Sequence, residues 1–150
     1  MTVDETFVLE QQLCFALHDA SRAMTAAYRP RLARIGLTYT QYALLLLLWE
    51  HGDVAFKDLS TAMHMDSATL SPLLRRMAEA GLVERLREPG GDERTVTVRL
   101  TKAGAALYKP ARAVQAEVEV ATGLARQHLE DLRQQLHDLA AQLREPVEPI

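Results

Sequence analysis

The hydrophobic pattern of this chain changes its period just after Gly81, and that change constrains the fold more than any other feature. Before Gly81 the apolar residues recur at helical spacing, whereas Val96, Val98 and Leu100 alternate with polar residues as in a half-buried strand. The segments LVERLR (82–87) and RTVTVRL (94–100), joined by the loop EPGGDE, therefore predict a β-hairpin. The predicted fold is mainly α with this one small β-hairpin.

The longest apolar run, YALLLLLW (42–49), predicts a helix that is buried at the centre of a domain. Thr38 and Gln41 have the spacing of a capping box at the start of this helix, and Gly52 is suited to ending it. Eight apolar residues fall far short of the ~20 that span a bilayer, so we expect no membrane association.

Three further helices are predicted before the hairpin. A long amphipathic helix covers about residues 5–27 and is expected to end at Pro30, because proline interrupts helical hydrogen bonding. A short helix covers residues 56–65. The next, 66–81, is capped by Asp66 or Ser67, and its inner stripe consists of Leu70, Leu73, Leu74 and Met77.

Two helices are predicted after the hairpin. Thr101 caps the first, which runs to about residue 121 with a kink near Pro110, and the second covers about 125–144. Apolar stripes at both ends of the chain need a partner, so the helices at about 5–28 and 102–144 are predicted to form a dimerisation platform. The whole chain, 1–150, is then a single domain with a separate lobe at about 38–100.

Composition places the chain among ordinary globular proteins, with 48% hydrophobic and 25% charged residues. The start MTVDETFV lacks the basic and apolar regions of a secretory signal. The single cysteine, Cys14, excludes an intrachain disulfide and fits a reducing compartment. We therefore expect a soluble cytoplasmic protein.

The arrangement of polar residues in the lobe favours binding to double-stranded DNA. Net charge is −3, and residues 57–102 hold eight Lys/Arg against seven acids, so binding depends on where individual arginines point. Hydroxyls near a helix N-terminus suit phosphates, arginines suit guanine, and Asp92 can brace Arg94 at the hairpin tip toward a minor groove. The candidate DNA contacts are Ser67, Thr69, Ser71, Arg75, Arg76, Asp92 and Arg94.

Three motifs within this lobe resemble those of the MarR family of winged-helix transcriptional regulators: LLRRMAEAGLVER, the DER of the hairpin, and VRLTKAG after it. LCFALHDASRAMTAAYRPRL followed by GLTYTQY is similar to one branch, the OhrR-like repressors that sense organic hydroperoxides. The resemblance covers about residues 10–120. It implies a winged helix-turn-helix, a homodimer, a pseudo-palindromic operator, no cofactor and no enzymatic activity.

The position of Cys14 in its helix favours a thiol that is sheltered and still reachable. At 100° per residue Cys14 lies about 60° or more from the centre of the apolar stripe, beside His18 and Ser21. An ordinary thiol is only about 3% thiolate at pH 7, so a sensor needs hydrogen-bond donors such as tyrosine hydroxyls. Tyr28 lies fourteen residues away, ~21 Å along a continuous helix, so a contact with Cys14 requires a second chain.

The resemblance implies that this contact exists. In OhrR-like repressors the residue matching Cys14 reacts with the peroxide, and tyrosines matching Tyr28 and Tyr39 reach it from the partner subunit. Cys14 would become a sulfenic acid, which a low-molecular-weight thiol caps or which closes to a sulfenamide. The chain resembles the one-cysteine subgroup, and His18 stands where close relatives are expected to have a tyrosine.

Other interpretations stay open. Cys14 is an inert helix residue if the protein is a MarR-like repressor that responds to a small aromatic ligand. A thiol peroxidase would need the alternating strands and helices of a thioredoxin-like fold, which this pattern lacks. A protein-binding winged helix would not need its arginines, and no histidine has metal-ligand spacing with Cys14.

Overall fold

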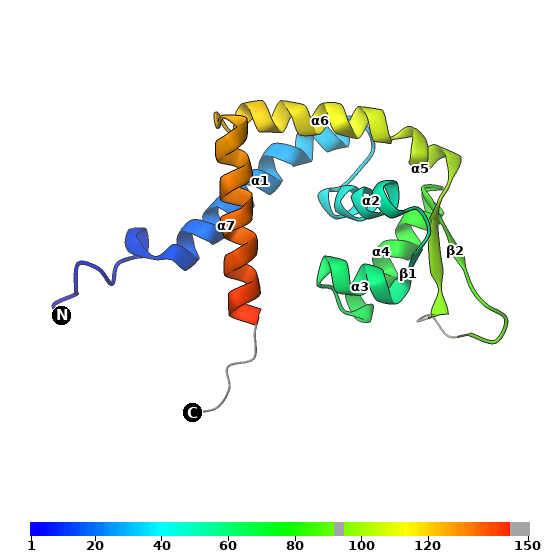
Figure 1. Cartoon of the computed structure of the whole chain (residues 1–150), viewed down its shortest axis with the longest axis horizontal. Coiled ribbons are helices and arrows are strands. Elements are labelled where there is room, and N and C mark those ends of the chain that lie inside the picture. Colours follow the sequence, from blue (N-terminus) through cyan, green and yellow to red (C-terminus); the bar gives the residue numbers. More distant parts are fainter. Residues whose placement is uncertain (92–94, 145–150) are drawn as a thin grey trace. The chain divides into compact units, whose positions relative to one another are not determined.

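The computed structural model of the chain describes residues 1–91 and 95–144, and it divides into two compact units, Met1–Gln115 and Ala116–Ile150. The first unit holds most of the secondary structure (Figure 1). The elements are η1 (Leu9–Gln11), α1 (Leu13–Ala33), α2 (Tyr39–His51), β1 (Val54–Ala55), α3 (Phe56–Met63), α4 (Ser67–Glu79), β2 (Val83–Leu86), β3 (Thr97–Leu100), α5 (Lys102–Ala106), α6 (Tyr108–Ala121) and α7 (Arg126–Arg144). Among the described residues, none of these helices has the length and apolar character needed to cross a membrane.

Helix α2 forms the centre of the first unit, which confirms the prediction from its apolar run. Leu44, Leu45 and Leu48 are at most 1% exposed, and burying each leucine contributes about 1.5–3 kcal/mol. The capping box at its start is complete: the Thr38 hydroxyl accepts from the Gln41 N–H at 3.2 Å, and the Gln41 side chain accepts from the Thr38 N–H at 3.0 Å. These hydrogen bonds satisfy two groups that a helix start otherwise leaves unpaired.

The boundaries predicted for the first helix were wrong at both ends. Helix α1 begins at Leu13 and continues through Pro30 to Ala33. Proline removes one hydrogen bond and does not end the helix here, because the fully buried Leu32 anchors the last turn in the core. The Arg31 side chain also donates to the Ala27 carbonyl at 2.7 Å, one turn earlier in the same helix. Tertiary packing therefore outweighs the local effect of Pro30.

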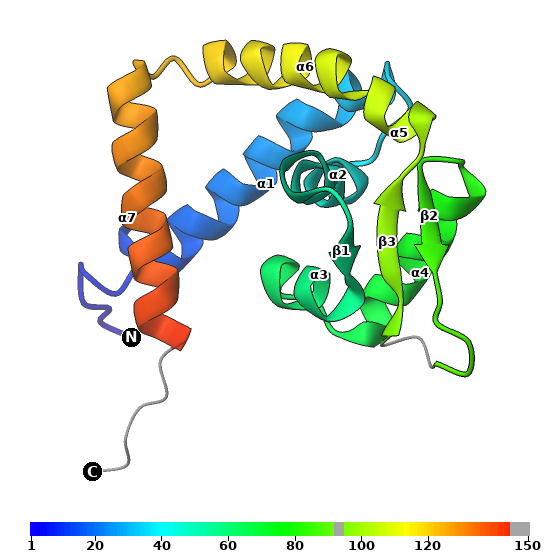
Figure 2. The same ribbon diagram turned by 45° about the vertical axis from the view of Figure 1, so that its right-hand side comes forward.

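The sheet has three antiparallel strands in the order β1-β3-β2, and it includes one strand that the sequence did not predict (Figure 2). β2 and β3 form the predicted hairpin, with Val83 opposite Leu100 and Leu86 opposite Thr97. Val96 and Val98 are buried, as their alternation indicated. The added strand β1 has only two residues, with Val54 opposite Val98, which is too short to show a period of its own.

The break in the helix after Thr101 lies three residues before the position predicted. α5 ends at Ala106 and α6 begins at Tyr108, so Pro110 falls in the first turn of α6. Proline has no N–H for the Ala106 carbonyl, and in a first turn that N–H is not needed. The prediction of an interruption was right. Its position places Pro110 in the first turn of a helix, where the missing N–H destabilises the helix least.

Helix α5 is fixed to the α4–β2 turn and to α2 through Gly104. The Thr101 hydroxyl donates to the Gly81 carbonyl at 2.6 Å and accepts from the Gly104 N–H at 3.1 Å. The Trp49 indole donates to the Gly104 carbonyl at 3.1 Å. A Cβ at Gly104 would lie 2.2 Å from the Leu82 carbonyl oxygen, so only glycine permits this approach.

In the second unit, α7 carries polar pairs one turn apart along its surface. Arg126 pairs with Glu130 at 3.1 Å, and Gln134 donates to Asp138 at 2.9 Å. No described residue of α7 is buried, and Leu132 and Leu136 are at least 40% exposed. The single-domain assignment and the dimerisation platform assigned to these helices stay predictions.

We expect Gly104→Ala to destabilise the protein by about 1–3 kcal/mol, because the added methyl forces the backbone of Leu82 to move. This loss exceeds the roughly 0.5–1 kcal/mol that alanine gains over glycine in a helix. Urea unfolding at fixed protein concentration measures the difference. Lys102→Ala, on the exposed side of the same helix, is the control and stays within about 0.5 kcal/mol of wild type. A Gly104→Ala protein as stable as wild type would contradict the close packing.

The ion pair at the base of the hairpin makes a second, pH-dependent prediction. Arg99 donates to the Asp53 carboxylate from Nε at 3.0 Å and from Nη2 at 2.7 Å. This hydrogen bonding lowers the pKa of Asp53 below its usual 3.8. A carboxylate whose pKa is lower in the folded state stabilises the fold above its unfolded pKa and loses that contribution as pH falls through the folded value.

Asp53→Asn should therefore lower the Tm modestly at pH 7, since exposed pairs contribute little. The Tm difference should shrink as pH falls through the folded pKa of Asp53, because the protonated side chain is then neutral like asparagine. Thermal scans from pH 2 to 8 test this, with Glu88→Gln in the hairpin loop as the control. A Tm difference that does not change with pH would exclude the ion pair as its cause.

Candidate DNA-binding face and thiol site

Helix α4 presents one apolar face to the core and one polar face to solvent. Asp66 caps it by accepting from the Thr69 N–H at 2.8 Å, and the hydrogen bonds from Thr69 lower the pKa of Asp66. The predicted inner stripe is buried, as expected: Leu70, Leu73, Leu74 and Met77. This packing leaves the candidate DNA contacts Ser67, Thr69, Arg75 and Arg76 exposed on the other side.

Ser71 does not lie on that face, so its assignment as a DNA contact was wrong. Its side chain is 7% exposed, and its hydroxyl has no hydrogen-bond partner among the described residues. Ser71 lies one turn before Leu74, and the apolar face of α4 is wide enough to include it. An unpaired buried hydroxyl destabilises a fold by about 1–3 kcal/mol, so Ser71 lowers the stability of α4 in its present position.

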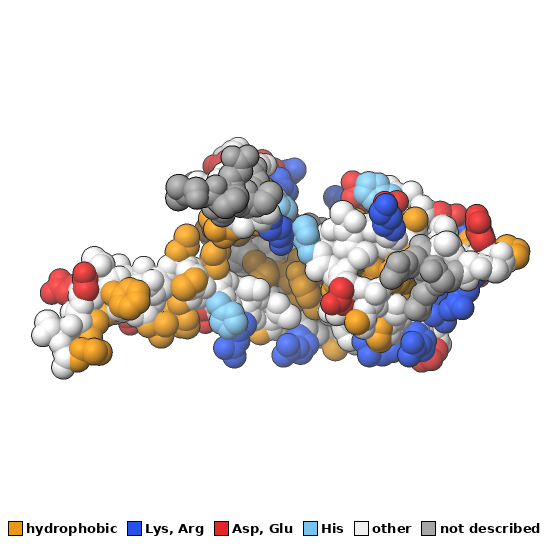
Figure 3. Space-filling view, turned by 90° about the horizontal axis from the view of Figure 1, so that it is seen from below, with side chains coloured by type: hydrophobic (Ala, Val, Ile, Leu, Met, Phe, Trp, Pro, Cys, Tyr) orange, Lys and Arg blue, Asp and Glu red, His pale blue; other side chains and the backbone are white. Residues whose placement is uncertain are grey.

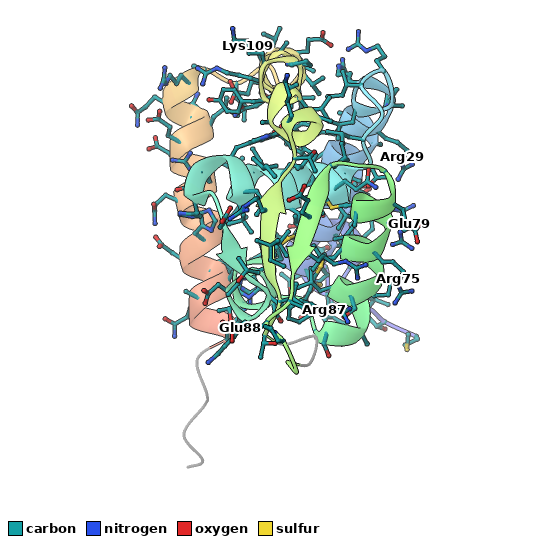
Figure 4. The ribbon with its side chains drawn as sticks, turned by 90° about the vertical axis from the view of Figure 1, so that its right-hand side faces the viewer. Arg29, Arg75, Glu79, Arg87, Glu88 and Lys109 are labelled. Atoms are coloured by element: carbon teal, nitrogen blue, oxygen red, sulfur yellow. The ribbon has the colours of Figure 1, made fainter. Side chains whose placement is uncertain are left out.

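The arginines of α4 are available for a ligand. Within the described part of the chain, neither Arg75 nor Arg76 has an ion pair or a hydrogen bond from its side chain. Figure 4 shows Arg75 and Glu79 projecting outward from α4, with Arg87 near the end of β2. A guanidinium on such a helix face can donate to a phosphate or, in pairs of hydrogen bonds, to guanine.

The hairpin adds one basic residue that the sequence analysis missed. Arg87 is exposed and directly follows β2, where the chain leaves the sheet for the loop. A basic residue immediately before the glycine-containing loop was the available signal for it. The predicted contacts Asp92 and Arg94 lie outside the described residues.

The thiol and the tyrosines assigned to it are far apart within one chain. Cys14 is exposed at the start of α1, with His18 one turn further on and also exposed. Tyr28 lies ~21 Å away along the same helix. Among the described residues, no three His, Cys, Asp or Glu side chains are grouped as metal ligands would be.

The structure instead brings three tyrosines together where α1 ends and α2 begins. Ring centroids are 5.7 Å apart for Tyr28 and Tyr39, 5.2 Å for Tyr28 and Tyr42, and 6.3 Å for Tyr39 and Tyr42. Tyr39 is 39% exposed, so the tyrosine cluster is open to solvent on one side. Tyr42 was missed as a site residue, although its i,i+3 spacing from Tyr39 places the two on one helix face.

Tyr42 also lines a small cavity. It has a volume of about 120 Å³, and Trp49 meets Tyr108 edge-on within its lining at a centroid distance of 5.7 Å. The residues that line this α2–α6 cavity are Tyr42, Leu46, Trp49, Tyr108, Ala111, Arg112 and Gln115. Three aromatic rings thus line it, beside one guanidinium.

Known proteins resemble this chain in both sequence and structure. The family model described as the MarR family matches residues 37–96. The organic hydroperoxide resistance transcriptional regulator of Bacillus subtilis (strain 168) is 44% identical over 126 residues, which cover 84% of this chain and 83% of that protein. A probable transcriptional regulator from Pseudomonas aeruginosa is 31% identical with a TM-score of 0.75, covering 88% of this chain and 99% of that one.

A DNA-bound structure is among the similar ones. Reduced AbfR bound to DNA has 27% identity and a TM-score of 0.72, covering 90% of this chain and 93% of that chain; AbfR is a protein of Staphylococcus epidermidis. These similarities confirm the predicted winged-helix fold and its assignment to transcriptional regulators.

We expect Arg75→Ala and Arg76→Ala each to weaken DNA binding. Loss of a base contact costs about 1–3 kcal/mol, roughly 5- to 150-fold in Kd, and relaxes specificity at one position. Loss of a phosphate contact weakens binding to all sequences and lowers the salt slope by about one. Anisotropy titrations with a duplex selected from a random pool, at several salt concentrations, distinguish the two. Ser71→Ala is the matched control on the buried face and should bind DNA as wild type does. If both arginine variants also bound DNA as wild type does, α4 would not be the recognition helix.

Proposed function

The chain belongs to the MarR family of DNA-binding transcriptional regulators, and on that basis we propose that it is a homodimeric repressor that senses organic hydroperoxides through Cys14. Oxidation of Cys14 then releases a pseudo-palindromic operator. The name of the Bacillus subtilis relative, at 44% identity, supports this effector class. The exposed face of α4 supports the DNA contact.

One observation carries the proposal: Cys14 is exposed at the start of α1, and the tyrosine cluster, which is open to solvent at Tyr39, lies at the other end of that helix. Of the 21 residues of α1 only Leu32 is buried, and Leu13 and Met24 are 61% and 42% exposed. An apolar helix face of this kind needs a partner. In a two-fold dimer, Cys14 of each chain can meet Tyr28 and Tyr39 of the other, because the interface contacts are reciprocal.

The chemistry needs only the thiol, the peroxide and a proton donor. The Cys14 thiolate attacks the terminal peroxide oxygen, so that an S–O bond forms while the O–O bond breaks. Sulfur loses two electrons, the peroxide is reduced to an alkoxide, and the alkoxide takes a proton to leave as an alcohol. Tyrosine hydroxyls donating to the sulfur would stabilise the thiolate before the attack. A low-molecular-weight thiol can then condense with the sulfenic acid, releasing water and forming a mixed disulfide.

DNA release requires that the modified thiol disturb the lobe. A 100- to 1000-fold loss of affinity corresponds to a coupling of about 3–4 kcal/mol. The tyrosine cluster lies at the start of α2, whose far end carries Trp49 and its hydrogen bond to Gly104. A group attached to Cys14 at this cluster would displace α2 and with it the lobe that holds α4. The two copies of α4 would then lose the ~34 Å spacing of successive major grooves.

The test measures the rate of thiol loss after mixing with one equivalent of cumene hydroperoxide, with intact mass recorded at each time point. The same rate is measured in parallel with hydrogen peroxide. We expect fast and selective oxidation of Cys14, and release of DNA from wild type but not from Cys14→Ser. Tyr28→Phe and Tyr39→Phe should each slow oxidation by roughly 10-fold or more, since a hydrogen bond to a charged group contributes about 1.5–3 kcal/mol.

Arg75→Ala is the control, because it changes the DNA-binding face and should leave the thiol rate unchanged. If wild-type Cys14 reacts no faster than free cysteine, the thiol is an inert helix residue. The protein would then respond to a different kind of effector.

A further inference from the structure

The α2–α6 cavity is large enough for one side chain and too small for a typical ligand. Sites for small molecules have volumes of about 300–1,000 Å³, whereas this cavity has about 120 Å³. A cavity of about 150 Å³ holds benzene, so this one accommodates a single apolar side chain. Leu46, on its rim, is 44% exposed and extends the apolar surface outward along α2.

The cavity also carries a charge that no described residue of the chain neutralises. Arg112 lines it and is exposed, and its guanidinium has no ion pair or hydrogen bond within the described ranges. An aromatic hollow beside a free guanidinium fits a segment that combines an apolar residue with a carboxylate.

The segment before α1 has that combination. Residues 1–12 contain three acids and no lysine or arginine. Phe7, Leu9 and Leu13 are each more than 60% exposed, and Glu10 lies among them. Asp4 is bound to Thr6, whereas the Glu10 carboxylate has no partner among the described residues. Figure 3 shows hydrophobic side chains exposed along this segment, with acidic ones near its tip.

A chain cannot use its own segment in this way. Helix α1 is 21 residues long, about 31 Å, and only its far end packs against α2. Figures 1 and 2 both show the start of α1 leading away from α2. A second copy related by a two-fold axis can place its segment on this cavity while receiving the first copy's segment in return.

We propose that the α2–α6 cavity receives residues 7–13 of a second copy, with Arg112 bound to the partner's Glu10. Tyr42 belongs both to this cavity and to the tyrosine cluster. A segment seated here therefore brings the partner's Cys14, four residues after Glu10, to Tyr28 and Tyr39. Arg112 is a positioning residue for the redox step, and this inference rests on the proposed function.

The first test reverses the two charges singly and together. Arg112→Glu and Glu10→Arg should each slow oxidation of Cys14 by cumene hydroperoxide about fivefold at low salt. The double variant should recover to within about twofold of wild type, because it restores the pair in the opposite sense. Raising the salt concentration should shrink the single-variant effects, as expected for exposed charges. Lys109→Glu is the matched control: it adds the same charge on α6 but does not line the cavity, so the rate should not change.

The second test asks whether the contact is made between chains. Cys14→Ser and Arg112→Glu proteins are mixed in equal amounts and allowed to exchange subunits. In a mixed dimer the only thiol belongs to the Arg112→Glu chain and faces the intact Arg112 of the other. About half of all thiols should then react at the wild-type rate, because half of the Arg112→Glu chains are in mixed dimers. No fast fraction would overturn the proposal.

Trp49 supplies a readout that does not depend on the thiol. It is the only tryptophan and lines the cavity, so its emission should shift to longer wavelength in both single variants and return in the double variant. Far-UV circular dichroism shows whether the variants are folded. Fast oxidation in wild type and equally fast oxidation in Arg112→Glu would overturn this inference and leave the proposed function standing. Slow oxidation in wild type would overturn the proposed function itself.

Discussion

Burial of the α2 leucines is the interaction on which the rest of the structure depends. Leu44, Leu45 and Leu48 fill the centre of the first unit, and both ends of the helix are then fixed in place. The start of α2 carries Tyr39 and Tyr42, while its end carries Trp49 and the hydrogen bond to α5. One rigid helix thus joins the tyrosine cluster to the base of the winged lobe, so a disturbance at one end has a direct mechanical path to the other.

Features set by neighbouring residues could be predicted from the sequence, and features set by packing could not. The caps at Thr38, Asp66 and Thr101 all formed as expected, because each needs only a side chain and an N–H three residues away. Pro30 was misjudged because its local effect is outweighed by Leu32, which is anchored in the core. β1 was missed because two residues gain strand structure only by pairing with β3.

The same distinction holds for the candidate site. The arginines of α4 followed from the helical period, whereas Ser71 was misplaced because the period alone does not give the width of the apolar face. Tyr28 and Tyr39 came from the family resemblance. Tyr42 and the α2–α6 cavity required knowing that α6 packs beside α2, which no periodicity indicates. The hairpin tip, with Asp92 and Arg94, lies outside the described residues and stays a prediction.

The near-complete exposure of α1 has a consequence for the amount of protein in the cell. Only one of the 21 residues of α1 is buried within the single chain, so in the proposed dimer the folding of α1 and assembly are thermodynamically linked. Dilution of that dimer would then remove both the pair of α4 helices and the complete thiol site, since each of these proposed sites draws on two chains. For the proposed repressor, scarcity of the protein would therefore weaken operator binding and peroxide sensing together.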